Sequence, residues 1–207
     1  TIVILVASLL LAVTLMDTWI LYTQMHSQTR QAGAYQLESV SSKLESAISD
    51  AETLTMERAI KAREHLSDQD ALAKFIYDKK NEITEGDTDA FNLYIAGASF
   101  CIIPDFDIPD NFNATERVWY TGAVKNQGKI YVSSPYQDAM SGDICYSVSV
   151  MLGDGDAVLG VDYTMEGIQS YIAQMSENAV NAIIVTDEGF IAGCSDVTMV
   201  GKKLVDH

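Results

Sequence analysis

The chain is poor in the residue types that build most catalytic and nucleic-acid-binding sites. Its 207 residues include only 3 histidines, 3 cysteines and 3 prolines. His26, His65 and His207 are far apart in the sequence, and none belongs to a His-Glu-x-x-His or other paired metal-ligand pattern. Basic residues are also scarce, since 13 Lys and Arg stand against 29 Asp and Glu, for a formal net charge of −16. The lack of a basic face argues against nucleic acid as a partner.

The sequence also lacks the short motifs of common enzyme classes. It contains no Gly-x-Ser-x-Gly nucleophile elbow and no Gly-x-x-x-x-Gly-Lys phosphate loop. Asp138 and Asp162 could in principle form an acid–base pair, but a cation at Arg117 would keep both carboxylates ionised. The acidic segment 153–156 has too few ligands for a calcium loop, and its Asp-Gly pairs predict a hairpin turn. We therefore expect no catalytic residue, no bound metal and no cofactor.

The three cysteines are too few for a disulfide scaffold, and no Cys-x-x-Cys occurs. Cys101 and Cys145 both lie in predicted strands, so a disulfide between them is possible if those strands are neighbours, and buried free thiols are the alternative. Cys194 stays single in either case.

The N-terminal segment is long, apolar and uncharged. No charged residue occurs before Asp17, and the preceding residues are mostly Ile, Val, Leu and Ala. With Trp19 and Tyr22 as interfacial aromatics, the stretch reaches the ~20 residues that span a bilayer. A signal peptide is the competing interpretation, but no small-residue cleavage site follows the apolar core. We predict a transmembrane helix over residues 1–23, which anchors the chain in a membrane.

A long amphipathic helix is predicted over residues 24–66, which contain no proline and a single glycine, Gly33. Apolar or small residues recur there in steps of three and four. These positions are Leu37, Val40, Leu44, Ala47, Ala51 and Leu54. The stripe can pack on its own domain or against the same helix of a second copy. Both kinds of packing can occur, at different positions along the helix. We expect a homodimer.

The rest of the chain is predicted to form an α+β domain with a PAS-like antiparallel sheet and helices on its face. Helices are predicted over residues 70–80 and 165–175. Strands are predicted over residues 91–95, 99–103, 130–133, 146–151 and 158–163, and a β-hairpin over residues 182–194.

One stretch of the chain gathers groups that suit a small zwitterion. A guanidinium forms a bidentate pair of hydrogen bonds with a carboxylate, while carboxylates and the faces of aromatic rings bind an ammonium. The residues of these types are Arg117, Trp119, Tyr120, Tyr136, Asp138 and Asp162. Each has a structural alternative: the rings can fill the core, and Asp138 can cap the turn before Ser141. Asp162 ends an apolar strand, where a buried carboxylate needs a cationic partner.

The order of these motifs resembles the double Cache sensor domain of bacterial transmembrane receptors. The resemblance runs from about Phe91 to the end of the chain. It rests on Arg117-Val-Trp-Tyr120, on Ser134-Pro-Tyr-Gln-Asp138 followed by Ser-Gly, and on the strand that ends Gly160-Val-Asp162.

The family's amino-acid-binding branch implies a role for each matching residue. Its counterparts of Arg117, Trp119 and Tyr136 hold the ligand carboxylate. Its counterparts of Asp138 and Asp162 hold the ammonium, and that of Tyr120 lines the pocket. Five residues before Arg117 that branch has a tyrosine, whereas this chain has Phe112, which keeps the ring and lacks the hydroxyl donor.

The resemblance also implies a domain organisation and a function. The transmembrane helix would be followed by a signalling and dimerisation helix (24–66) and by a membrane-distal PAS-like ligand-binding module (67–178). Residues 179–207 would begin a membrane-proximal module, of which this chain holds only the start. The sensor region would lie outside the cytoplasm, bind an amino acid or similar zwitterion without catalysis, and signal to a histidine kinase, diguanylate cyclase or chemotaxis output. The alternative is a Cache-fold module that binds another small carboxylate or amine, or a protein partner.

Overall fold

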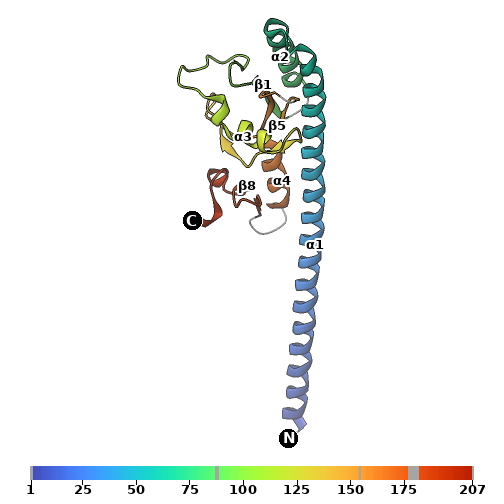
Figure 1. Cartoon of the computed structure of the whole chain (residues 1–207). Coiled ribbons are helices and arrows are strands. Elements are labelled where there is room, and N and C mark those ends of the chain that lie inside the picture. Colours follow the sequence, from blue (N-terminus) through green and yellow to red (C-terminus); the bar gives the residue numbers. More distant parts are fainter. Residues whose placement is uncertain (1, 87–88, 154, 177–181, 207) are drawn as a thin grey trace. The chain divides into compact units, whose positions relative to one another are not determined.

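The computed structural model describes residues 2–86, 89–153, 155–176 and 182–206; within them, the side chains of residues 2–12, 29, 174–176 and 206 are not described. The chain divides into two compact units, residues 1–43 and residues 44–207. Helix α1 (Ile2–Ala62) begins in the first unit and ends in the second (Figure 1). The long helix expected from the sequence is therefore confirmed as far as Ala62.

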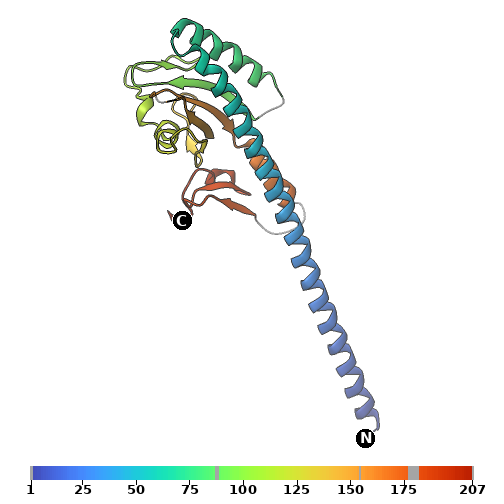
Figure 2. The same cartoon turned by 45° about the vertical axis from the view of Figure 1, so that its right-hand side comes forward.

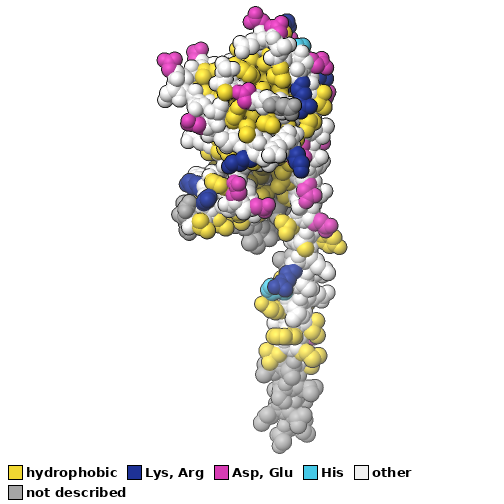
Figure 3. Space-filling view, in the orientation of Figure 1, with side chains coloured by type: hydrophobic (Ala, Val, Ile, Leu, Met, Phe, Trp, Pro, Cys, Tyr) yellow, Lys and Arg dark blue, Asp and Glu magenta, His cyan; other side chains and the backbone are white. Residues whose placement is uncertain are grey.

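The first unit is helical throughout its described residues, and its apolar side chains near the N-terminus are exposed (Figure 3). They are Val13, Leu15, Met16, Trp19, Ile20, Leu21, Tyr22 and Met25. Much of the predicted transmembrane segment falls on residues 1–12, whose side chains lie outside the described part of the chain. Among the described residues, no helix has the length and hydropathy of a membrane span.

Two helical segments open the second unit. A 3-10 turn, η1 (Arg63–His65), follows α1 and leads into α2 (Gln69–Thr84). Asp68 caps α2, because its carboxylate accepts hydrogen bonds at 3.1 Å from the backbone N–H groups of Asp70 and Ala71. The helix predicted over residues 70–80 is thus confirmed, with one more turn at its C-terminal end.

The predicted antiparallel sheet is confirmed, with six strands in the order β2-β1-β6-β5-β3 and β4 also paired with β5. The strands are β1 (Ala90–Ala96), β2 (Cys101–Ile102), β3 (Tyr131–Val132), β4 (Tyr136–Gln137), β5 (Ile144–Met151) and β6 (Val158–Thr164). β5 and β6 form the expected hairpin, closed by a 2.7 Å bond from the Leu152 N–H to the Ala157 carbonyl. β1 pairs with β6, so segments far apart in sequence meet at the centre of the sheet.

Alternation along the strands gives the sheet an apolar face that packs against α2 and the last turns of α1 (Figure 2). Its fully buried members include Leu93, Ile95, Val148, Val150, Leu159 and Val161. Ala51 of α1 is buried there at 4% exposure, and Leu54 packs against the same cluster. This part of the helix stripe therefore packs on its own domain, whereas Leu37 in the first unit is 61% exposed.

The opposite face of the sheet packs against α3 (Val118–Lys125), a helix that the sequence did not predict. Its eight residues include Val, Trp, Tyr, Thr and Gly, which are weak helix formers. Trp119, Tyr120 and Ala123 of α3 are buried in a cluster with Tyr94 of β1. Tertiary packing therefore decides the conformation of this segment.

The C-terminal part confirms the predicted helix and hairpin. α4 (Glu166–Ser176) precedes a two-stranded sheet of β7 (Ile183–Val185) and β8 (Ile191–Cys194). Gly189 has φ = +85° in the connecting turn, and its N–H donates to the Thr186 carbonyl at 2.8 Å. Glycine adopts this left-handed conformation without the steric penalty of a Cβ.

The three cysteines are free thiols. Cys101 lies on β2 and Cys145 on β5, and β1 and β6 separate these strands in the sheet. Three strand spacings amount to roughly 14 Å, well beyond the Cα separation of a disulfide. Burial raises the pKa of the Cys101 thiol to about 11, which keeps it protonated at neutral pH. The free-thiol alternative is the one realised.

Candidate functional site

The candidate site lies on the face of the sheet that α3 covers. Strand alternation places small and polar residues on this face, where the opposite face has Val, Leu and Ile. They are Asn92 and Tyr94 of β1, Ser147 and Ser149 of β5, and Gly160 and Asp162 of β6. In the strand register Asp162 stands opposite Asn92 on one side and Ser147 on the other.

Asp162 is a buried carboxylate, 2% exposed, held by three hydroxyl groups. The Tyr94 hydroxyl and the Ser147 Oγ each donate to its Oδ1 at 2.6 Å. The Tyr136 hydroxyl lies 3.3 Å from the same oxygen and 2.7 Å from the Ser147 Oγ. Among the described residues no cation forms an ion pair with Asp162.

Burial raises the pKa of Asp162 to about 7, well above its ordinary value of 3.8. Hydrogen bonds from Ser147 and Tyr94 favour the ionised form and offset part of this rise in pKa, while the nearby Asp138 carboxylate adds to it. The site therefore has the electrostatic character of a place for a positive charge, since a cation beside Asp162 would stabilise the ionised form.

Gly160 makes room for the ring of Tyr94, which lies against it across the β1–β6 pair. A Cβ at residue 160 would lie 2.5 Å from Tyr94 Cε2, closer than van der Waals contact allows. Trp119 of α3 meets the same ring edge-on, with 4.7 Å between the ring centroids. These two contacts hold the Tyr94 hydroxyl where it donates to Asp162.

Arg117 precedes α3 and has extended backbone angles, φ −75° and ψ 150°. A preceding 3-10 turn, capped by the Asn113 side chain, sets the direction in which the chain enters α3. The Arg117 guanidinium carbon lies 5.7 Å from the ring centroid of Phe112. Within the described part of the chain Arg117 has no ion pair, which leaves its N–H donors available to an anion.

A small cavity of about 10 Å³ brings most of the predicted site residues together. It is lined by Asn92, Tyr94, Ile103, Phe112, Arg117, Trp119, Asp138, Met140 and Asp162. Five of the seven residues predicted from the sequence are on this wall, and they supply one cation, two carboxylates and two aromatic rings. The volume is that of roughly one water molecule, so the walls must separate to admit an amino acid.

The other two predicted residues differ in their relation to the cavity. Tyr136 reaches the cluster from β4 through its hydrogen bonds to Ser147 and Asp162. The Tyr120 hydroxyl instead donates to the backbone carbonyl of Asp156 at 2.6 Å, and Tyr120 is not among the cavity-lining residues. Its ring packs edge-on against Trp119, with 5.7 Å between centroids.

Asp138 caps the turn before Ser141, which is its structural alternative, and also lines the cavity. Its Oδ2 accepts hydrogen bonds from the N–H groups of Met140 at 3.0 Å and Ser141 at 2.6 Å. The carboxylate thus caps the turn that follows β4, and both bonds use the same oxygen. Asp138 also lines the cavity.

Sequence reasoning missed three polar residues of the site: Asn92, Tyr94 and Ser147. Asn92 and Tyr94 alternate within the otherwise apolar run Ala90–Ala96. Ser147 lies in Ile144–Met151, where every second residue from Cys145 to Ser149 is a cysteine or a serine. A polar side chain at every second position of a buried strand was the available signal, because such positions share one face.

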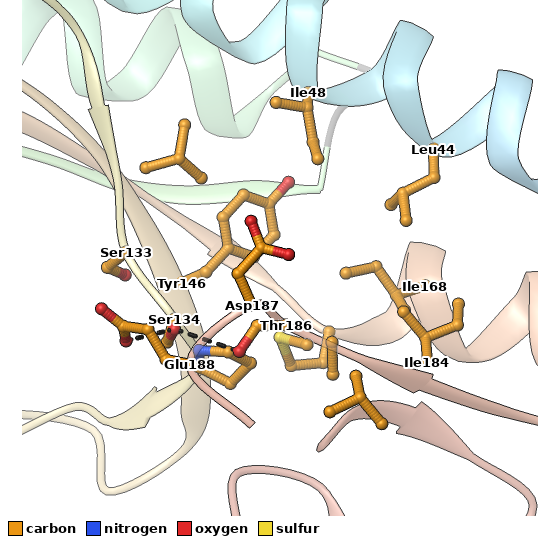
Figure 4. A pocket seen from close by; sticks show the side chains of 15 residues that line it. Leu44, Ile48, Ser133, Ser134, Tyr146, Ile168, Ile184, Thr186, Asp187 and Glu188 are labelled. Atoms are coloured by element: carbon orange, nitrogen blue, oxygen red, sulfur yellow. Dashed lines mark hydrogen bonds between the residues drawn. The ribbon is translucent and has the colours of Figure 1, made fainter. Parts of the chain in front are cut away.

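A further cavity, of about 480 Å³, lies between the sheet, residues 44–48 of α1 and the β7–β8 hairpin (Figure 4). On its rim the Ser134 Oγ donates to Glu188 Oε2 at 2.7 Å and lies 3.3 Å from Thr186 Oγ1. Ser134 lies two residues before Tyr136, so these bonds connect the β7–β8 turn with the strand that carries a site residue.

No family model matches the chain, but it is similar in part to methyl-accepting chemotaxis proteins and in fold to solved ligand-binding domains. The methyl-accepting chemotaxis protein TlpB of Bacillus subtilis (strain 168) is 32% identical over 104 residues, which are 50% of this chain and 14% of that protein. The ligand-binding domain of the Pseudomonas fluorescens chemoreceptor CtaA, solved with L-alanine, aligns with a TM-score of 0.68 at 21% identity over 82% of this chain and 73% of that one.

The ligand-binding domain of Mlp24, solved with asparagine, aligns with a TM-score of 0.72 at 11% identity, covering 88% of this chain and 77% of that chain. These likenesses establish the fold, which is that of a chemoreceptor ligand-binding domain. The fold expected from the sequence resemblance is therefore confirmed.

Proposed function

We propose that this chain is the extracytoplasmic ligand-binding region of a chemotaxis receptor and that its cavity binds an amino acid or a similar small zwitterion. One observation carries the proposal. Arg117, a cation, and Asp162, a buried carboxylate, line the same cavity, and neither forms an ion pair with any of the described residues. A ligand with one carboxylate and one ammonium satisfies both groups at once.

Each site residue then has a defined role. The Arg117 guanidinium grips the ligand carboxylate with two parallel N–H bonds, beside the Trp119 ring and the Tyr136 hydroxyl. Asp138 and Asp162 hold the ammonium. Phe112 supports the guanidinium through its ring and adds no hydroxyl donor to the carboxylate side. Tyr120 contributes by packing against Trp119 rather than by direct contact.

The proteins with this fold support the proposal. CtaA was solved with L-alanine and Mlp24 with asparagine, and both ligands are zwitterions. The likeness to methyl-accepting chemotaxis proteins favours a chemotaxis output over a histidine kinase or a diguanylate cyclase. The sensing region itself acts by binding, without catalysis.

The mechanism is a population shift between a closed empty pocket and an expanded occupied one. The closed cavity of about 10 Å³ is held by the Tyr94, Ser147 and Tyr136 hydroxyl groups around Asp162. Room for a ligand ammonium beside this carboxylate requires the walls to separate, which displaces Tyr136 and so loosens β4, and β4 leads back to Ser134 and the β7–β8 turn. That route would pass the change from the membrane-distal module (67–178) to a membrane-proximal module beginning at residue 179.

The membrane anchor and the dimer belong to the same proposal. The exposed apolar side chains between residues 13 and 25 support a segment that continues a membrane anchor, which we assign to residues 1–23. The helix between that anchor and the module exposes Tyr35 and Leu37, which supports a homodimer with signalling through residues 24–66.

A second candidate function keeps the fold and replaces the small molecule with a protein partner. The small size of the cavity favours it, because a pocket filled by its own side chains needs no ligand. Another small carboxylate or amine is a further variant of the first candidate, favoured by the absence of a hydroxyl at Phe112.

A thermal-shift screen of the purified chain against the 20 amino acids and small amines tests the proposal. A ligand at 100 times its Kd adds about 2.7 kcal/mol of stability, which is a shift of roughly 5–10 °C for a domain of this size. We expect one ligand class to shift the parent chain and to leave Arg117→Ala and Asp162→Asn unshifted. If the folded parent responds to no compound, the zwitterion pocket is wrong and the protein-partner candidate takes its place.

A further inference from the structure

Asn92 is a buried polar residue on the site face, and its side-chain oxygen has no partner in the described part of the chain. It lies within β1 and is 3% exposed. Its Oδ1 is buried and has no hydrogen-bond partner among the described residues. An unsatisfied buried amide disfavours folding, so its presence calls for a partner from outside the chain.

The neighbouring polar side chains on this face do have partners. Tyr94 and Ser147 donate to Asp162, and the Ser149 Oγ donates to the Trp119 carbonyl at 2.8 Å. The unsatisfied oxygen of Asn92 is therefore a local feature of the cavity wall and not a general property of the sheet face.

The position of Asn92 links it to the ammonium side of the site. It pairs with Asp162 in the β1–β6 register, and both line the cavity with Asp138. Side chains directly opposite each other on neighbouring strands have Cβ atoms about 5 Å apart, so both can reach one ligand atom. All three hydroxyl groups around Asp162 address Oδ1, and within the described residues Oδ2 has no donor.

We propose that Asn92 Oδ1 accepts a hydrogen bond from the ammonium of the ligand and thereby makes the site selective for primary amines. This inference rests on the proposed zwitterion-binding function. A primary ammonium has three N–H donors, one each for Asp162, Asp138 and Asn92. A secondary ammonium, as in an N-methyl amino acid, has two donors and leaves Asn92 unsatisfied in a closed site. Selectivity of this kind arises because a buried acceptor without a donor opposes binding.

The inference predicts a measurable preference. Titration calorimetry would compare L-alanine, L-valine and L-asparagine with their N-methyl derivatives, on the parent chain and on Asn92→Leu. Leucine has a similar size and no polar atom. We expect the parent to prefer the primary amine of at least one pair by about tenfold or more, the effect of one hydrogen bond to a charged group. In Asn92→Leu the affinity for that primary amine should fall about tenfold, and the affinity for its N-methyl derivative should change little.

Two further variants separate a binding role from a structural one. Asn92→Ser keeps a smaller acceptor and should keep part of the preference. Ser149→Ala is the matched control, because its hydroxyl lies on the same face but is paired within the protein. It should leave the ratio of the two affinities unchanged, even where it lowers the melting temperature.

The outcomes distinguish this inference from the proposed function. If Asn92→Leu lowers both affinities equally or leaves the ratio as in the parent, Asn92 does not select the amine, although the zwitterion site stands. If the folded parent binds none of the six compounds and responds to no amino acid or amine in the thermal-shift screen, the proposed function fails together with the inference.

Discussion

Replacement of Asp162 by Asn should stabilise the unliganded protein at neutral and alkaline pH while strongly weakening ligand binding. Asp162 is 2% exposed, and burial raises its pKa from the ordinary 3.8 to about 7. Asparagine keeps an oxygen that accepts the hydrogen bonds of Tyr94 and Ser147 but never carries a charge. The variant therefore removes the buried negative charge, which no ligand cation neutralises in the unliganded protein, and keeps the packing.

The sign and size of the effect follow from the pKa. Because folding raises the pKa of Asp162, its contribution to stability is fully present below pH 3.8 and is lost as the pH rises to about 7. Each pH unit in this window lowers the free energy of unfolding by about 1.4 kcal/mol, and the whole window by about 4 kcal/mol at most. Between pH 5 and pH 8 the parent should therefore lose about 2–3 kcal/mol relative to Asp162→Asn.

Urea unfolding of both chains at pH 5, 6, 7 and 8 measures this difference, because other groups titrate alike in both. Asp196→Asn is a suitable control. The exposed Asp196 carboxylate accepts hydrogen bonds from Thr198, which lower its pKa, so its replacement should not stabilise the protein at any of these pH values. If the difference between the parent and Asp162→Asn stays constant from pH 5 to pH 8, Asp162 is not a destabilising buried ion and the argument is refuted.

Four further predictions concern the same site. Ligand affinity should rise from pH 6 to pH 8 with release of a proton, because the ammonium binds ionised Asp162; calorimetry in buffers of different ionisation enthalpy measures this, and pH-independent binding would contradict it. Arg117→Lys should lower affinity about tenfold with stability within ~0.5 kcal/mol of the parent, since Lys cannot form the bidentate pair; equal affinity would argue against a bound carboxylate. Gly160→Ala should cost about 1–3 kcal/mol in urea unfolding, because its Cβ collides with the Tyr94 ring, and a neutral result would mean that the ring moves freely. Tyr120→Phe should cost about 1 kcal/mol and leave affinity unchanged, and a clear loss of affinity would put Tyr120 in the pocket.

Strand periodicity and turn chemistry predicted most of the fold. The β5–β6 hairpin and the β7–β8 hairpin were found because their turns hold Asp-Gly or Gly residues between apolar runs. Helix α3 escaped prediction because its residues have weak helix propensity and its conformation depends on packing against the sheet. Strand β4 (Tyr136–Gln137) escaped because it lies in the polar, proline-containing segment 134–138, which has no apolar run or alternation.

The candidate site was predictable only in part. The charges of Arg117 and Asp162, together with the order of the motifs, identified the residues proposed to bind the carboxylate end and the ammonium end of the ligand. The sequence could not show that Tyr94 donates to Asp162, because these residues are 68 positions apart and are brought together by the pairing of β1 with β6. Nor could it show that Tyr120 turns its hydroxyl to a backbone carbonyl, since that depends on the position of the β5–β6 turn relative to α3.

The most direct test of the zwitterion site is a calorimetric comparison of L-alanine, L-valine and L-asparagine with their decarboxylated and deaminated analogues. The account predicts that the parent binds at least one amino acid and loses most of its affinity for each truncated analogue. Arg117→Ala should lose most of the parent's preference for that amino acid over the amine, and Asp162→Asn should lose most of the preference for it over the acid. If the parent binds an amino acid while each variant distinguishes it from the matching analogue as strongly as the parent does, Arg117 and Asp162 do not hold the two ends of the ligand.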